Sequence, residues 1–319
     1  MATSLEFEAP LSELQAELDK ARSAAVVNPD SGRNADRLQA QLNERLYVLY
    51  QGLNPWQKLQ VARHSNRPHP LDYLRLAFTD FTELHGDRCF GDDKAIVGGP
   101  AFLDGRAVMV VAHQKGHDTR ENVRRNFGMA GPEGFRKAQR LFKLAEKLGL
   151  PVITMIDTPG ANVGVADEER GQVEAIASSI AEMCSLKVPI ISVVTGEANS
   201  GGALAIGVAD RILMLEHSTY SVASPEAAAV ILWRSAQRAP EAAEAMRITA
   251  QDMLNFKLVD MVIPEPLGGA HRDATGMALT VRDTLIPVVT SLVSMGITDL
   301  LEARYRRYRD LGPFTGSDL

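Results

Sequence analysis

The strongest constraint on the fold is a set of four short apolar runs in the middle of the chain. They are Ala107–Ala112 (AVMVVA), Val152–Ile156 (VITMI), Ile190–Val194 (IISVV) and Ile212–Leu215 (ILML). None of them alternates between apolar and polar residues, which is typical of strands covered by helices on both faces. Stretches with helical character lie between them, over Gly134–Leu148, Glu168–Leu186 and Gly201–Val208. The order of strand, helix and strand predicts right-handed βαβ crossovers and a layered α/β domain.

The beginning and the end of the chain are predicted to be helical. Leucines recur at helical spacing before residue 50, and a turn-rich stretch, Ala25–Arg33 (AVVNPDSGR), divides them into two groups. The groups are Leu11, Leu14 and Leu18, and then Leu38, Leu42 and Leu46. We therefore predict a helical hairpin, which either packs on the domain or binds a partner. Beyond Pro264, two more helices are predicted, over Thr275–Ser294 and Asp299–Asp310.

The composition is that of an ordinary globular protein. Among the 319 residues, 45% are hydrophobic and 23% are charged, which suffices for a large core without disulfides or metals. The net charge of −6 argues against a dedicated nucleic-acid binder. The longest uncharged run, Thr284–Thr298, has 15 residues, fewer than the ~18 to 20 that span a bilayer. With two distant cysteines and no secretory signal at the start, we expect a cytoplasmic protein.

The most informative stretch is Gly196–Gly207 (GEANSGGALAIG), which follows the Ile190–Val194 run. Ser200, Gly201 and Gly202 are predicted at the first turn of a helix, where backbone N–H groups lack partners within the helix. Glycines let a ligand approach the backbone closely, so such a corner can stabilise an oxyanion. The alternative is a tight strand-to-helix turn that serves only packing.

Two further stretches have a similar character. Asp157–Gly164 (DTPGANVG) directly follows an apolar run, so its loop is expected at the same carboxyl edge of the sheet, where α/β folds bind ligands. In Ser218–Ala229, Ser224 is a good N-cap, Pro225 suits the first helical position and Glu226 suits the first turn. That helix start can also present N–H groups to an anion. The alternatives are a plain turn in the first stretch and a plain helix start in the second.

Several common sites are not supported by the sequence. The chain has no GxxxxGK[ST] loop, no GxGxxG after a strand and no GxSxG elbow, which argues against a P-loop nucleotidase, a dinucleotide binder and a serine hydrolase. His113 and His117 lie on either side of Gly116 without a further ligand at helical spacing, so no metal site is predicted. Nine Lys and Arg between Lys115 and Lys147 predict a solvated helix face; the alternative is a patch for CoA phosphates, an acidic carrier domain or nucleic acid.

These corners, in this order, resemble the alpha subunit of bacterial acetyl-CoA carboxylase carboxyltransferase. The motifs that carry the resemblance are Asp72–Phe78 (DYLRLAF), Gly91–Gly99 (GDDKAIVGG), His113–Gly116 (HQKG), Arg124–Met129 (RRNFGM), Ile156–Ala161 (IDTPGA), Glu168–Gln172 (EERGQ), Ser200–Gly207 (SGGALAIG), Ser218–Val222 (STYSV) and Ile263–Arg272 (IPEPLGGAHR). They cover nearly the whole chain, and several long motifs in a fixed order are far more specific than one glycine-rich loop. The chain departs from the usual family pattern at Asn162, Val163, Ala198, Asn199 and Ala227.

The resemblance implies a crotonase-like α/β fold, in which ββα units surround a spiral core. It implies an N-terminal helical arm at 1–55, a carboxyltransferase domain at 56–297 and a C-terminal helix and tail at 298–319. The implied reaction moves a carboxyl group from carboxybiotin, held on a separate biotin carboxyl carrier protein, to acetyl-CoA. Its product is malonyl-CoA, and it is the first committed step of fatty acid synthesis. The implied partners are biotin carboxylase and a zinc-ribbon beta subunit in an α2β2 assembly, with the zinc in the beta subunit and no metal, membrane or nucleic acid bound to this chain.

The family also implies roles for the corner residues. The N–H groups of Gly201 and Gly202 would donate to the ureido oxygen of biotin as backbone oxyanion donors. The walls of the same substrate-binding site would be Gly160, Ala161, Gly164, Ser200, Ser224, Pro225, Glu226, Ala227 and Ala228. Two alternatives stay open at this point: a carboxyltransferase or decarboxylase subunit for another acyl-CoA, and a non-catalytic regulatory subunit that binds RNA through Lys115–Lys147.

Overall fold

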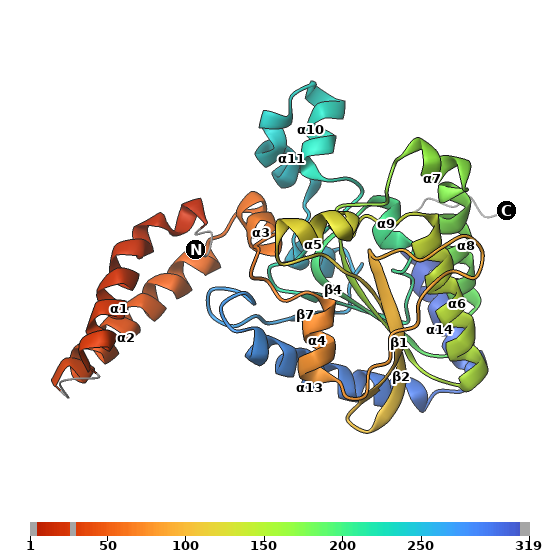
Figure 1. The fold of residues 1–319 in the computed structure, drawn as a ribbon, viewed down its shortest axis with the longest axis horizontal. Helices are drawn as coiled ribbons and strands as arrows, with labels where there is room; N and C mark the ends of the chain where they lie inside the picture. Colours follow the sequence, from red (N-terminus) through yellow and green to blue (C-terminus); the bar gives the residue numbers. More distant parts are fainter. Residues whose placement is uncertain (1–4, 26–29, 313–319) are drawn as a thin grey trace.

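A seven-stranded sheet forms the centre of the molecule in the computed structural model, which describes residues 5–25 and 30–312 (Figure 1). The strands are β1 (Ile96–Leu103), β2 (Arg106–His113), β3 (Val152–Thr158), β4 (Ile190–Asn199), β5 (Arg211–Leu215), β6 (Thr219–Ser221) and β7 (Met261–Ile263). Their order is β1-β2-β3-β4-β5-β7, with β6 paired to β4. β1 runs antiparallel to β2, and every other pairing is parallel. The four strands predicted from apolar runs are confirmed as β2 to β5.

Strand β1 was not predicted because Gly98, Gly99 and Pro100 interrupt its apolar pattern. The structure explains both glycines by close packing. A Cβ on Gly98 would lie 2.6 Å from Leu141 Cδ1, and one on Gly99 would collide with the carbonyl of Thr82. Strand β1 therefore needs glycine where a strand pattern normally has a side chain, and the sheet is mixed rather than wholly parallel.

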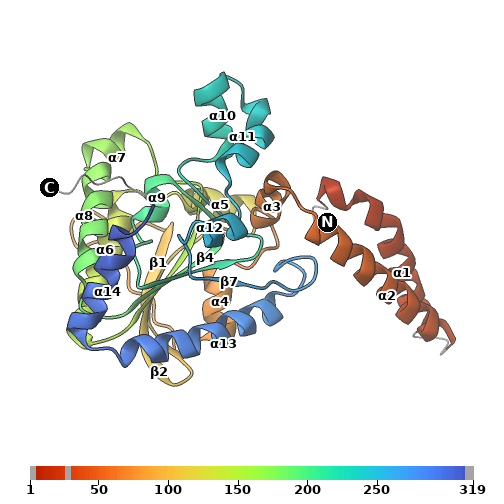
Figure 2. The same cartoon turned by 180° about the vertical axis from the view of Figure 1, so that it is seen from behind.

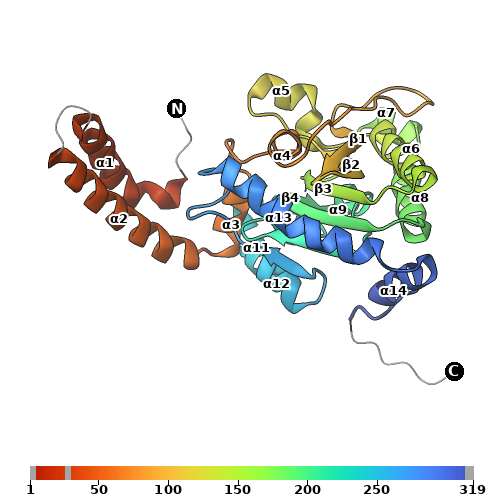
Figure 3. The same cartoon turned by 90° about the horizontal axis from the view of Figure 1, so that it is seen from below.

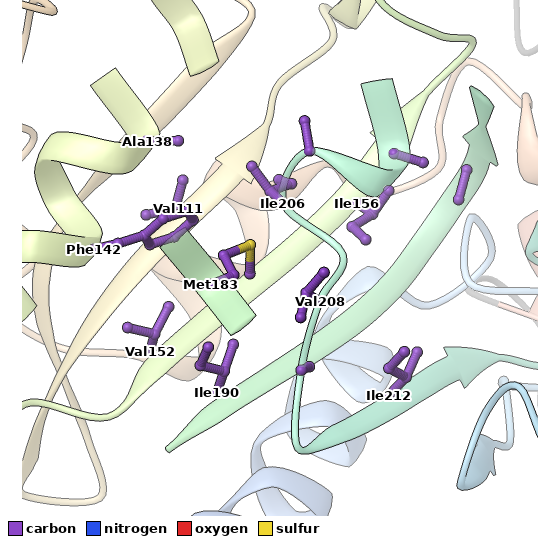
Figure 4. Close-up of a cluster of buried hydrophobic side chains, with 14 of the residues drawn as sticks. Val111, Ala138, Phe142, Val152, Ile156, Met183, Ile190, Ile206, Val208 and Ile212 are labelled. Carbon is purple, nitrogen blue, oxygen red and sulfur yellow. The ribbon is translucent and has the colours of Figure 1, made fainter. Parts of the chain in front are cut away.

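Helices cover both faces of the sheet, as the unbroken apolar strands predict. On one face, α6 (Pro132–Leu148) and α8 (Gln172–Ser185) pack Phe142 and Met183 onto side chains of β2 to β5 (Figure 4). On the other face, α4 (Pro70–Ala77) and α13 (Ala274–Val293) pack against the sheet (Figure 3). By length and composition α13 could cross a membrane, but its buried residues, including Val281 and Leu285, belong to the core beside the strands.

The last described helix, α14 (Ile297–Arg309), is fastened to the body by one buried arginine. Arg304 donates to both carboxylate oxygens of Asp210 at 2.8 and 2.9 Å and to the carbonyl groups of three residues near the end of α8. This contact places α14 beside α8. The division of the chain at residues 55 and 297 stays a prediction.

The predicted helical hairpin is confirmed as a projecting arm (Figures 1 and 2). It consists of a 3-10 turn, η1 (Glu6–Leu11), followed by α1 (Ser12–Ala25) and α2 (Asp30–Gln51), and all six predicted leucines are buried between them. Residues 26–29 of the predicted break lie outside the described residues. At the base of the arm, Glu8 accepts hydrogen bonds from Tyr50 at 2.8 Å and from Arg272 of the body at 2.6 Å.

The remaining helices correct two predicted boundaries. The stretch predicted as one helix over Glu168–Leu186 is two helices, α7 (Val165–Glu169) and α8, because Gly171 between them has a φ of +81°. The helix predicted over Gly201–Val208 is only one turn long, α9 (Ser200–Leu204). Besides α4, β6 and β7, the elements without a predicted counterpart include α3 (Pro55–Ala62), α5 (Thr119–Arg124), η2 (Asn126–Gly128), η3 (Ala236–Arg238), α11 (Ala239–Met246) and α12 (Ala250–Asn255).

The helix start predicted at Ser224 is confirmed as α10 (Pro225–Trp233). Together with α11 it forms a small helical unit that projects from the body, called the lobe below and defined as Pro225–Met246 (Figures 1 and 2).

Candidate functional site

The two glycine-bearing corners meet in the structure. A Cβ on Gly202 would lie 2.5 Å from the backbone nitrogen of Ala161 and 2.5 Å from the carbonyl carbon of Gly160. The loop after β3 therefore touches the first turn of α9 backbone to backbone, and a side chain at Gly202 would separate them. Thr158 shapes that loop, because its hydroxyl donates to the Gly160 carbonyl at 2.7 Å and accepts from the Gly160 N–H at 3.1 Å. The close packing of the two stretches thus requires glycine at position 202.

At the start of α9, backbone N–H groups have no acceptor inside the helix. The first N–H groups of any helix lack intrahelical acceptors, and here these include Gly201 and Gly202. The side chain of the N-cap residue, Asn199, donates instead to Glu197 at 3.1 Å and accepts from Ser221 at 2.6 Å. Ser200 has a φ of +58°, a left-handed conformation that costs a serine about 1 to 3 kcal/mol. This tight bend turns the chain from β4 directly into the helix. The turn Ser200–Gly202, together with Gly160 and Ala161, is called the corner below.

The prediction that the chain leaves its strand at Gly196 is wrong, because β4 continues to Asn199. The first part of β4 pairs with β5, and its last residues, 197–199, pair with β6. Gly196 has a packing role in this extension. A Cβ there would collide with the carboxylate of Asp157, which lies where the register between β3 and β4 shifts.

A mostly buried group of charged side chains lies next to the corner, to which Glu197 links it through Asn199. Lys115 Nζ is 2.8 Å from Asp157 Oδ1 and 2.8 Å from Glu197 Oε1. His69 Nδ1 is 3.1 Å from Asp157 Oδ2, and Arg63 Nε donates to Glu197 Oε2 at 2.9 Å. Arg63 follows α3, His69 precedes α4 and Lys115 follows β2, while Asp157 and Glu197 lie in β3 and β4. The network therefore joins the elements around the corner.

Mutual pairing keeps these groups charged although they are buried. Burial by itself would raise the pKa of Asp157, but the nearby Lys115 ammonium and the hydrogen bond with His69 lower it well below its usual range. Burial also opposes ionisation of Glu197, and the cations of Lys115 and Arg63 lower its pKa. The two carboxylates in turn raise the pKa of Lys115 against the effect of its burial. The network therefore carries fixed opposite charges at neutral pH.

The third predicted stretch joins the buried network through an ion pair. Ser224 caps α10 by accepting from the Ala227 N–H at 3.2 Å, as predicted, and Pro225 is the first helical residue. The carboxylate of Glu226 faces Arg63, with 2.5 Å between Arg63 Nη1 and Glu226 Oε1. Ala228 is buried inside the lobe. The Glu226 side chain thus ties α10 to the body and is not free to bind a ligand.

A cleft of about 520 Å³ opens beside the corner and is lined at one end by Ser200, Gly201 and Ser221. Its other walls are mostly apolar and include Leu204, Tyr220, Met253, Phe256, Leu258 and Tyr308. Sequence reasoning missed these residues, because they belong to α9, β6, α12 and α14 and no motif joins them. An apolar cleft with a few polar groups at one end is the usual form of a small-molecule site.

Gly164, one of the predicted wall residues, lies apart from the corner. Gly164 caps α7, and a Cβ there would meet Asp167 and Asn162 rather than the corner. Asn162 donates to Asp167 at 2.5 Å, and its backbone N–H donates to the Ala130 carbonyl at 2.9 Å. The loop beyond Ala161 is thus held by its own polar contacts.

The predicted solvated face over Lys115–Lys147 is wrong for three of its members. Lys115 belongs to the buried network, and Lys137 is buried with its Nζ 2.6 Å from Asp92 Oδ1. Arg125 is also buried and donates to the carbonyl of Lys94. The spacing of charges along the chain could not separate surface residues from these, because α6 and the α5 segment turn some of their cations inward.

The two histidines of this region lie in different surroundings. His113 is fully buried at the end of β2, and burial lowers its pKa to about 3. A backbone contact with Gly202 acts in the opposite direction on this pKa, so the ring lies against the first turn of α9. His117 is exposed, with Nε2 2.7 Å from Asp72 Oδ2. Among the described residues no group of three or more His, Cys, Asp or Glu is arranged to hold a metal ion.

The comparisons with known proteins agree on one family. The model of a family described as acetyl co-enzyme A carboxylase carboxyltransferase-like matches residues 4–312. The chain is 52% identical over 312 residues to the acetyl-coenzyme A carboxylase carboxyl transferase subunit alpha of Edwardsiella ictaluri, covering 97% of this chain and 98% of that protein. It is 51% identical over 314 residues to the corresponding subunit of Thermus thermophilus, with the same coverage.

Solved structures with lower sequence identity share the fold. A Pseudomonas malonate decarboxylase hetero-tetramer in complex with coenzyme A matches with a TM-score of 0.58 and 20% identity, over 75% of this chain and 94% of that chain. The beta subunit of P. aeruginosa geranyl-CoA carboxylase matches with a TM-score of 0.56 and 16% identity, over 84% and 47%. At these identities the match concerns the fold, which is the crotonase-like fold expected from the motifs.

Proposed function

The chain belongs to the acetyl-CoA carboxylase carboxyltransferase alpha-subunit family, and on this basis we propose that its corner forms the carboxybiotin half of a shared active site. Its enzymatic class is that of the carboxyltransferase alpha subunit of acetyl-CoA carboxylase. It accordingly works within a biotin-dependent, multisubunit enzyme. The proposal concerns the finer points: which residues form the half-site, what they bind and which partner completes it.

The corner suits the chemistry of carboxyl transfer. When carboxybiotin loses CO2, the N1–C bond breaks and its electron pair remains on the ureido group, so negative charge develops on the ureido oxygen. In this proposal the N–H groups of Gly201 and Gly202 donate to that oxygen. One such donor is worth roughly 3 to 4 kcal/mol in other oxyanion holes. Since glycine has no side chain, neither residue blocks access to these N–H groups.

The rest of the reaction needs no side-chain base from this chain. The ureido anion can take a proton from the methyl group of acetyl-CoA, and the resulting enolate carbon then forms a bond to CO2 and gives malonyl-CoA. The charges of the buried network lie within the protein, where they hold the corner in place. We propose that Gly160, Ala161 and Ser200 line the ureido group and that the apolar cleft receives the less polar part of biotin.

The observation that carries this proposal is the backbone contact between Gly202 and Gly160–Ala161 at an uncapped helix start beside an apolar cleft. Its test is the reverse reaction, malonyl-CoA-dependent carboxylation of biocytin, by this chain with and without a zinc-ribbon beta subunit. Activity is expected only in the mixture, because each subunit supplies half of the site. Activity of this chain alone would contradict the half-site proposal, as would a stable complex with no activity.

An exposed apolar face on the lobe supports a partner subunit there. Helix α10 (PEAAAVILW) is apolar nearly all round, yet Val230, Ile231 and Leu232 are 49%, 77% and 63% exposed. A helix of this kind normally lies buried, and a projecting apolar surface marks an interaction site. We propose that the beta subunit covers it in an α2β2 assembly in the cytoplasm, which also contacts the biotin carboxyl carrier protein and biotin carboxylase.

Replacing Ile231 by Glu is expected to weaken this assembly at least tenfold, because a charge would be buried in an apolar interface. The measurement is the dissociation constant of the alpha–beta complex from analytical ultracentrifugation. Ile297→Glu is the matched control, since Ile297 is 55% exposed at the start of α14, on the side of the molecule opposite the lobe (Figure 2). Equal effects of the two substitutions would contradict an interface on α10.

A further inference from the structure

The lobe is an almost separate unit. Ala228, Ala229 and Ala242 form its own small apolar cluster. It joins the body through two chain connections, near Ala223 and near Ile248, and rests on α3 through the side chains of Leu59 and Trp56. A small unit with two connections and one apolar contact can rock as a rigid body unless a further contact holds it.

Arg63 at the end of α3 supplies such a contact. Its guanidinium makes a two-bond fork with Glu226, at 2.5 Å from Nη1 to Oε1 and 3.3 Å from Nη2 to Oε2. On its other side, Nε donates to Glu197 Oε2 at 2.9 Å. The planar fork of arginine fixes the orientation of a carboxylate as well as its distance, which a lysine ammonium does not. Arg63 therefore fixes the first turn of α10 relative to β4.

The same contact reaches the corner through Glu197. The carboxylate of Glu197 is buried, and besides Arg63 it contacts Lys115 and the side-chain amide of Asn199. Asn199 is the N-cap residue of α9, so one further residue leads to the turn that carries Gly201. The path from the lobe to the corner thus runs through three side chains: Arg63, Glu197 and Asn199.

We propose that Arg63 is a positioning residue that clamps the lobe against the corner and so sets the width of the carboxybiotin half-site. The inference rests on the proposed function, since it takes the start of α10 as a wall of that site. Arg63 is not a catalytic residue, because both sides of its guanidinium are occupied by carboxylates. Loss of the fork frees the lobe to move, and a displacement of about 1 Å in a binding wall can lower a rate ~100-fold.

The test compares Arg63→Ala, Arg63→Lys and Glu226→Gln in the assembled alpha–beta enzyme. For Arg63→Ala we expect kcat/KM for biocytin to fall about 10- to 100-fold, with an unchanged KM for malonyl-CoA. The kcat/KM of Arg63→Lys should lie between those of the wild type and Arg63→Ala, since lysine keeps the charge but cannot make the two-bond fork. The Arg63→Ala, Glu226→Gln double variant should lose no more kcat/KM for biocytin than Arg63→Ala alone, because both substitutions break the same contact.

The control is Arg238→Ala, which removes a two-bond pair with Glu241 on the surface of the lobe itself. It is expected to leave the kinetics of biocytin carboxylation unchanged. Hydrogen exchange of the isolated full-length chain is a second readout: Arg63→Ala should speed exchange in α10 and α11 but not in β3 or β4. Hydrogen exchange tests the clamp even if the wild-type mixture is inactive. An inactive wild-type mixture would contradict the proposed function but not the clamp. Wild-type kinetics together with wild-type exchange in Arg63→Ala would overturn the clamp.

Discussion

Gly202→Ala is expected to lower the rate of carboxyl transfer by the assembled enzyme about 10²- to 10³-fold, as the loss of one oxyanion donor does elsewhere. The added methyl group would lie 2.5 Å from the backbone of both Gly160 and Ala161. Backbone atoms on both sides cannot yield as a flexible side chain does, so the loop after β3 must move away from α9. The donors and the wall that faces them would then no longer share one geometry.

Gly201→Ala is the comparison variant, and we expect it to lower the rate less than Gly202→Ala because no backbone atom has to move. A Cβ at Gly201 would meet only Ile176, at 3.6 Å, which is ordinary van der Waals contact. The two variants differ by one position in the same helical turn, so helix propensity and hydrophobicity change equally. The measurement is kcat for malonyl-CoA-dependent carboxylation of biocytin, with complex formation checked for both variants. If the two substitutions had equal effects, the close approach of the two corners would not be what the site requires.

The corners themselves could be predicted from the sequence because each is local. Ser200–Gly202 and Gly160–Ala161 each follow an apolar run, and strands that run parallel end at one edge of a sheet. What could not be predicted is why position 196 is also glycine. Gly196 reads like part of the same flexible corner, but it lies within β4 and makes room for the carboxylate of Asp157. A pattern of glycines does not distinguish ligand access from close packing.

The buried network could not be predicted at all, because its members are far apart in the chain. Arg63 and Glu226 are separated by 163 positions, and Lys115 and Glu197 by 82. In the sequence Lys115 resembles the first cation of a surface run. The spacing of charges does not show that its side chain, just after β2, points into the protein. Only the tertiary fold, which brings the ends of β2, β3 and β4 together with Arg63, shows that these charges neutralise one another.

Lys115→Met is expected to lower the free energy of unfolding at pH 7 by about 3 to 5 kcal/mol, the usual cost of removing one partner from a buried ion pair. Methionine keeps the length and apolar stem of lysine, so the change isolates the charge. The Asp157 and Glu197 side chains, which are almost fully buried, would then face each other without their shared cation. The measurement is urea unfolding of the full-length chain. Lys143→Met is the control, because Lys143 is 62% exposed and 3.4 Å from Glu182, and its urea midpoint should barely change.

The pH dependence of this difference identifies the cause. In the wild type the pKa values of Asp157 and Glu197 are lowered from 3.8 and 4.5, so their stabilisation is present above those values and lost as the pH falls through the lower folded-state values. The pKa of Lys115 is raised above 10.5, so its contribution is present below that value and lost only at higher pH. Without Lys115, less opposes the effect of burial on the pKa of the two carboxyls, so they take up protons at higher pH than in the wild type. The stability difference between wild type and Lys115→Met should therefore be largest near pH 7 and narrow toward pH 4, whereas a packing defect would leave it constant.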